Sequence, residues 1–420
     1  MKFIYKLLSL SLAIACLSGC SAANTEIASS SAATATVTPT TDSTEVPASN
    51  NVFTSAGDGL YVTTDSGIYE LQTVFPDSAN IFYTDANTKE RIFLCANPNC
   101  THADESCPSY IATPSAMFPP MLLRVGDQLL VVFTEATDSS NPHGMLMNMD
   151  GSNRRTVFEL ASNQYMQGGF CTSGNDLYFD LYEINDSGNV TYQLWYVSFE
   201  NGTSEKVMDL GSDSDHYSLC DGANNELCFN HVSSDGISYC MYNPQSKTIS
   251  DPFFVDSSVS GNSMIQDGYL FVLDEQASSV QRIRLSDEEQ ASASFTVKEG
   301  FGAPSMRYLF DGNLMITEAQ TTASDGSYGV CSYILDFGTR NCTEFTLQTP
   351  YNNRPVYVLT TIGDACYVAT DYKTYTPTSV SEDGTVSNFD YVANIYAFIT
   401  KQDYINSNQN GYSMVKDAFE

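Results

Sequence analysis

Turn-forming residues followed by a short apolar and aromatic run recur along this chain. Each copy opens with Gly, Asn or Asp and continues into residues such as Leu, Tyr, Phe and Val, which suit a pleated, half-buried strand. The seven copies begin at Gly57, Gly126, Gly174, Asn224, Asp267, Asp311 and Gly363. From the second copy onward they are spaced 43 to 52 residues apart. Repeats of this length with several short strands each predict the blades of a β-propeller.

A second hairpin follows several of these copies. Its strands are expected at 193–197 and 206–210 in one repeat, and at 333–336 and 344–347 in another. No long segment keeps the 3.6-residue apolar period of a helix, so helices should be few. We therefore predict an all-β fold, a seven-bladed β-propeller over residues 53–420. Six or eight blades are alternatives because the first and last copies are atypical, and a pair of β-sandwiches is the competing fold.

The N-terminal 52 residues follow a different pattern. Lys2 and Lys6 precede an apolar segment at 7–17, and the sequence Leu-Ser-Gly that ends at Cys20 resembles the lipobox of bacterial lipoproteins. We expect residues 1–19 to be a signal peptide and Cys20 to carry the lipid. An ordinary signal peptide or an anchor helix is the alternative, although the apolar segment is short for a membrane span.

Residues 20–52 are rich in Ser, Thr, Ala and Pro and have no apolar period, which is typical of a flexible tether. A chain lipidated at Cys20 would be attached to the outer face of the cell membrane, with its folded part extracellular. The chain has 50 acidic and 18 basic residues and a net charge of −32. This charge repels phosphate backbones, so nucleic acid is excluded as a partner, whereas a glycan, a peptide or a surface protein remains.

Cysteine and histidine gather in one predicted loop at 94–108. Cys95, Cys100, His102 and Cys107 have the spacing C-x4-C-x-H-x4-C. Three thiolates and one imidazole form a tetrahedral ligand set that suits a structural zinc ion. The spacing differs from the common C-x2-C pattern, so a local disulfide with one free thiol, or three unconnected thiols, are the alternatives.

The other cysteines outside the leader are mostly expected to be small buried apolar residues. Counting outward from the turn at 223–225 places Cys220 opposite Cys228 on neighbouring strands, so a disulfide between them is one interpretation. Free thiols are the other. Cys342 falls in a polar turn and has no predicted role.

Several motifs together resemble TolB-type β-propeller lipoproteins of Gram-positive anaerobic bacteria, a group without an assigned activity. The resemblance is carried by the lipobox, the tether, the Cys/His loop, an Asp-Gly turn at 150–151, and a C-terminal Tyr-Ala-Phe-Ile segment at 396–399. It implies a surface lipoprotein and supplies no catalytic residues.

The sequence has no G-x-S-x-G nucleophile motif, and paired carboxylates cannot be selected among so many acids without geometry. Two functions are therefore weighed. The first is a lipid-anchored extracellular binding or scaffold module, and the alternative is a surface hydrolase or lyase acting on polysaccharide. Converging carboxylates at the mouth of the propeller channel would favour the enzyme.

Overall fold

The computed structural model describes most of the chain after residue 53. The described residues are 54–55, 59–74, 78–113, 119–137, 140–256, 263–296, 299–319, 329–375, 378–380, 386–388 and 391–418. They belong to one compact unit, Glu45–Glu420. The predicted signal peptide, Cys20 and the tether lie outside the described residues. No helix in the described part is long and apolar enough to cross a membrane.

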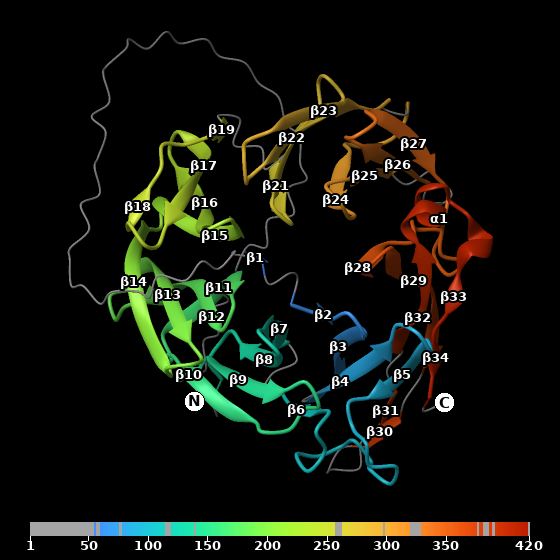
Figure 1. Cartoon of the computed structure of the whole chain (residues 1–420), viewed down its shortest axis with the longest axis horizontal. Coiled ribbons are helices and arrows are strands. Elements are labelled where there is room, and N and C mark those ends of the chain that lie inside the picture. Colours follow the sequence, from blue (N-terminus) through green and yellow to red (C-terminus); the bar gives the residue numbers. More distant parts are fainter. Residues whose placement is uncertain are drawn as a thin grey trace. The chain divides into compact units, whose positions relative to one another are not determined.

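Antiparallel sheets follow one another in chain order (Figure 1). The first contains β2 (Tyr61–Thr63), β3 (Gly67–Val74), β4 (Ser78–Asp85) and β5 (Glu90–Phe93), with β6 (Tyr110–Ala112) also paired to β4. The second contains β7 (Met121–Val125), β8 (Gln128–Phe133), β9 (His143–Asn148) and β10 (Arg155–Glu159).

A ten-stranded sheet follows and consists of two units. Its first unit contains β11 (Gln164–Ser173), β12 (Asp176–Ile184), β13 (Val190–Ser198) and β14 (Thr203–Ser212). Its second contains β15 (Asp215–Ala223), β16 (Glu226–Ser233), β17 (Gly236–Asn243) and β18 (Thr248–Ile249). β1 (Thr54–Ser55) pairs with β11, and β19 (Phe254–Asp256) pairs with β17. The two units are joined by only a short pairing between β14 and β15.

The remaining sheets repeat the four-stranded plan. One contains β20 (Ser263–Gln266), β21 (Tyr269–Asp274), β22 (Ser279–Arg284) and β23 (Gln290–Ser294). The next contains β24 (Ser305–Tyr308), β25 (Leu314–Ala319), β26 (Val330–Asp336) and β27 (Asn341–Phe345). The last contains β28 (Val358–Ile362), β29 (Ala365–Tyr375), β32 (Tyr391–Thr400) and β33 (Ser413–Met414).

Short elements complete the described structure. β30 (Thr378–Val380) and β31 (Val386–Asn388) form a hairpin, and α1 (Lys401–Ile405) and the 3-10 turn η1 (Gln409–Gly411) follow β32. Thr400 caps α1 by accepting a hydrogen bond from the Asp403 N–H through its side chain. β34 (Lys416–Asp417) then pairs in parallel with β5 and so joins the end of the chain to the first sheet.

The recurring turn residues adopt the left-handed backbone conformation that such turns need. The first residue of each copy from the second onward has a φ between 53° and 61°. Gly adopts this conformation without strain, and Asn and Asp tolerate it better than other residues. Each of these turns connects the first and second strands of its unit.

The first copy coincides with an earlier strand of its unit than the other copies do. Its apolar run enters β2, which is the first strand of its unit, and Gly57 lies outside the described residues. The turn that corresponds to the other copies is at Thr64–Gly67, where the Thr64 hydroxyl and the Gly67 backbone exchange hydrogen bonds.

Apolar layers between consecutive sheets form the core. One layer joins the sheets of β3 and β8, the next joins those of β8 and β12, and further layers follow in chain order. A last layer joins Ile68 of β3 to Tyr367, Tyr396 and Phe398 of the final sheet. Each sheet thus packs against two neighbours, which is the arrangement of a propeller and not of two sandwiches. The all-β propeller prediction is confirmed; the number of blades stays a prediction, since one sheet joins two units.

Candidate metal centre and neighbouring sites

The Cys/His loop lies within the outer edge of the first sheet. β5 and β6 pair with different halves of β4, and the loop leaves the sheet between them (Figure 1). Both ends of the loop bind Ile81: Leu94 donates its N–H to the Ile81 carbonyl at 2.9 Å, and Ile81 donates to the Ser109 carbonyl at 2.8 Å. The loop is therefore an excursion from one interrupted strand.

Two local turns bring the ligand residues together. The Asn97 side chain accepts the Asn99 N–H at 3.1 Å, and the Asp104 carboxylate accepts the Ser106 N–H at 2.9 Å. The Cys107 N–H in turn donates to the Asp104 carbonyl at 3.0 Å. Asn and Asp side chains commonly stabilise turns by such bonds. The polar residues between the cysteines therefore shape the loop.

The four predicted ligand residues converge. One ligand atom from each of Cys95, Cys100, His102 and Cys107 lies within 4.8 Å of the others. The His102 Nδ1 atom lies 3.2 Å from the Cys107 Sγ atom, and the His102 N–H donates to the Cys100 Sγ atom at 3.4 Å. Three sulfur atoms and one imidazole nitrogen at this separation could hold a metal ion.

The protein environment favours one thiolate in this set. Burial raises the pKa of Cys107, but hydrogen bonds from Ser109 and His102 outweigh it and lower the pKa to about 6. Burial raises the pKa of Cys95 to about 11. Cys107 therefore ionises at lower pH than Cys95, and metal ligation requires the thiolate.

The second sheet supports the loop through Arg154. Its guanidinium donates to the Tyr110 carbonyl at 2.6 Å and to the Pro108 carbonyl. Gly151 approaches the same segment so closely that a Cβ atom there would lie 2.4 Å from the Pro108 carbonyl oxygen. The Asp-Gly turn noted in the sequence therefore serves the close approach of two sheets as well as the hairpin.

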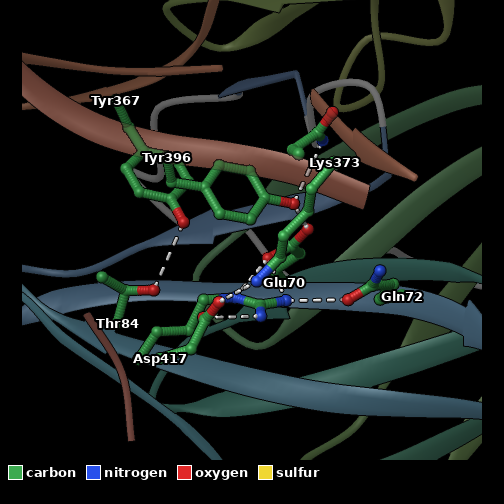
Figure 2. Close-up of polar contacts among 9 residues, drawn as sticks. Glu70, Gln72, Thr84, Tyr367, Lys373, Tyr396 and Asp417 are labelled. Carbon is green, nitrogen blue, oxygen red and sulfur yellow. Dashed lines mark hydrogen bonds and ion pairs between the residues drawn. The ribbon is translucent and has the colours of Figure 1, made fainter. Parts of the chain in front are cut away.

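A buried polar cluster lies where the last sheet meets the first (Figure 2). The Arg91 guanidinium donates to one Glu70 carboxylate oxygen at 3.0 and 2.9 Å, to Gln72 at 2.8 Å and to Asp417 at 3.2 Å. The Tyr396 hydroxyl donates to the other Glu70 oxygen. We call these five residues the closure cluster, because they belong to β3, β5, β32 and β34.

Electrostatics in the closure cluster favour the charged form of Arg91. Burial alone would lower the pKa of Arg91, but the Glu70 carboxylate and nearby groups raise it above its ordinary value. Burial and the same carboxylate raise the pKa of Tyr396. Sequence reasoning missed this cluster. The signal was one acidic residue in the apolar run of β3, but its partners are up to 326 positions distant.

The register of Cys220 and Cys228 differs from the count along the sequence. A β-bulge between Leu219 and Asp221 leaves Cys220 out of register, so Asp221 lies opposite Cys228. Neither Cys220 nor Cys228 is in a disulfide. Burial raises the pKa of Cys220 to about 12 and keeps the thiol protonated. A bulge adds a residue to one strand only, and counting from the turn cannot detect it.

Half-buried aromatic rings form a row at one end of the β11–β15 region. Tyr165 and Tyr182 stack with ring centroids 5.1 Å apart, and Tyr192 lies 6.1 Å from Tyr182. Tyr192 in turn stacks on His216, which belongs to the next unit, at 3.9 Å. We call these four residues the aromatic row. Tyr side chains present both an apolar ring and a hydroxyl, and such residues are common in ligand contacts.

Comparisons with known proteins give likeness of fold. No protein-family model matches the sequence, and no curated protein matches it. Among solved structures, a puromycin hydrolase S511A mutant complexed with PGG is 11% identical with a TM-score of 0.43; the match covers 82% of this chain and 59% of that chain. Oligogalacturonate lyase from Vibrio parahaemolyticus is 9% identical with a TM-score of 0.41, covering 83% and 92%.

A putative 6-phosphogluconolactonase from Bacteroides fragilis NCTC 9343 is 13% identical with a TM-score of 0.39, covering 84% of this chain and all of that chain. The chain spans only 35% of tricorn protease and 59% of the puromycin hydrolase chain. These likenesses assign no activity, substrate or metal to the present chain.

Proposed function

We propose that this chain is a lipid-anchored extracellular binding or scaffold module whose Cys/His loop holds a structural zinc ion. The observation that carries the proposal is the convergence of four protein ligand atoms within 4.8 Å. Four protein ligands occupy all the coordination positions of a tetrahedral zinc ion and leave none for water or substrate. The metal would then stabilise the fold and take no part in a reaction.

The ligand chemistry supports zinc over other common ions. Three thiolates and an imidazole are soft or intermediate donors, whereas magnesium and calcium prefer carboxylate, carbonyl and water oxygens. His102 is also held by a ring stack on Phe93, with centroids 4.0 Å apart. This stack fixes the plane of the imidazole ring.

Zinc content tests this part of the proposal directly. The purified chain should contain about one zinc ion per molecule, and Cys100→Ser should remove it because three ligands bind a structural ion far more weakly. Cys342→Ser is the matched control, since Cys342 is an exposed cysteine outside the loop and should leave the zinc content unchanged. A metal-free wild-type chain with a Cys95–Cys107 disulfide, mapped by mass spectrometry, would contradict the proposal.

The binding role is supported by the aromatic row and by the predicted attachment at Cys20. Rings and hydroxyls offer contacts for a glycan, a peptide or a surface protein, and a tethered propeller could present them away from the membrane. The assay is retention of the chain on immobilised cell-wall glycans and on peptides, compared between wild type and Tyr182→Ala. Retention that depends on Tyr182 supports the binding module. Release of shortened or unsaturated oligosaccharides would support the polysaccharide hydrolase or lyase instead.

A further inference from the structure

The Cys/His loop interrupts the outer strand of the first sheet. β5 has four residues and β6 has three, and they pair with opposite halves of β4. Strands this short provide few ladder bonds of their own. Anything that fixes the loop between them therefore also fixes where each half lies along β4.

β5 has a second partner at the end of the chain. In the parallel pairing of β34 with β5, Lys416 donates its N–H to the Lys89 carbonyl at 2.9 Å, and Ala418 donates to the Arg91 carbonyl at 3.0 Å. β34 has two residues, and the described backbone hydrogen bonds of this segment join it to β5. This pairing joins the C-terminal segment to the first sheet.

A continuous series of side-chain contacts leads from the loop to β34. His102 stacks on Phe93 with an interplanar angle of 10°, and Phe93 contacts Phe82 with centroids 4.5 Å apart. The Arg91 guanidinium lies 3.8 Å from the centre of the Phe82 ring and binds Asp417 of β34. Displacement of the imidazole would remove the ring that packs on Phe93, the first contact of this series.

His102 also has a backbone conformation that its surroundings must maintain. Its φ is +55°, a conformation that costs free energy for a residue with a side chain. Such a conformation persists when several contacts impose it. A metal ion bound to His102 and to Cys100 and Cys107 on either side of it would impose this conformation.

We propose that metal binding in the Cys/His loop acts as a latch for ring closure. The ion orders the loop, the loop holds β5 in register, and β5 holds β34; loss of the ion releases β34 while the other sheets stay folded. This inference rests on the proposed metal site. It adds that the site controls the junction between the last and first sheets, so the availability of the metal sets the order of the C-terminal segment.

Hydrogen exchange followed by mass spectrometry tests the latch on the purified chain. Zinc content is measured first, and exchange is then compared with zinc and after chelation. Amides of 413–418 and of 90–93 should exchange about tenfold faster or more after chelation, because local opening exposes them without global unfolding. Peptides from 176–198 serve as the internal reference and should not change. Cys100→Ser should behave as the chelated protein and Cys342→Ser as the wild type.

Phe93→Leu tests the side-chain contacts between the loop and β34 without changing a metal ligand. It keeps all four ligand residues and removes the ring between His102 and Phe82, so it should retain zinc while 413–418 exchanges faster. One zinc per chain with unchanged exchange at 413–418 after chelation would overturn the latch and leave the zinc site standing. Faster exchange of every peptide would overturn it as well, because the ion would then support the whole fold. A wild-type chain that binds no zinc would overturn both proposals.

Discussion

Asp180 provides a direct test of how burial controls the charge of this protein. It lies in β12 and is 1% exposed. Its Oδ2 atom accepts the N–H of Leu219, in the adjacent unit, at 3.1 Å. Burial raises the pKa of Asp180 to about 7, and backbone hydrogen bonds oppose this only in part. The perturbation is Asp180→Asn, which keeps the shape and removes the titration.

The direction of the pH effect on stability follows from the number of protons that the folded and unfolded states bind. Between about pH 4 and pH 7 the folded chain keeps a proton on Asp180 that the unfolded chain releases, so the free energy of unfolding falls as the pH rises through this window. A change from 3.8 to about 7 corresponds to on the order of 4 kcal/mol as an upper limit. Above pH 7 the stabilisation from the protonated Asp180 side chain is fully lost. Below pH 4 both states are protonated and the loss is absent.

The assay is urea unfolding at several values between pH 4 and pH 8, followed by the fluorescence of Trp195, the single tryptophan. The stability of Asp180→Asn relative to wild type should increase by up to about 4 kcal/mol across this range. Asp186→Asn, at an exposed turn carboxyl, is the control and should run parallel to wild type. Parallel curves for wild type and Asp180→Asn would refute the reasoning, because Asp180 would then titrate alike in both states.

Three further changes test separate parts of the structure. Arg91→Met should lower the free energy of unfolding by about 3–5 kcal/mol, because its buried carboxylate partner loses its counter-charge. Arg284→Met, at a more exposed ion pair, should lower it by less than about 1 kcal/mol. Thermal melting compares the two variants, and equal losses of stability would contradict the role of burial. Gly268→Ala should cost about 1–2 kcal/mol from backbone strain alone, and Gly151→Ala should cost more because its Cβ also meets a carbonyl; similar melting temperatures would argue against the close approach. Cys20→Ala should move the chain from the membrane fraction to the soluble fraction, and unchanged membrane attachment on fractionation would point to an uncleaved helix.

Much of the candidate metal site could be predicted because its parts are close in sequence. Cys95, Cys100, His102 and Cys107 lie within one short segment, and Asn97 and other turn residues sit between them. The spacing predicted the ligand set but allowed a disulfide as the alternative. The sequence does not state how Ile81 and the flanking strand halves place the loop so that the four ligand atoms converge.

Local chemistry accounts for what the sequence determined by itself. Residues such as Gly126 and Asn224 tolerate a positive φ, and the apolar runs that follow them form strands, so the recurring turns, the strand-rich fold and its period were readable. Tertiary structure decided the rest. The bulge at Cys220 depends on how β15 meets β16, and the closure cluster unites Glu70 with Tyr396. Such pairings are chosen by packing across the whole ring, where many apolar strands compete for each partner, and no local preference selects among them.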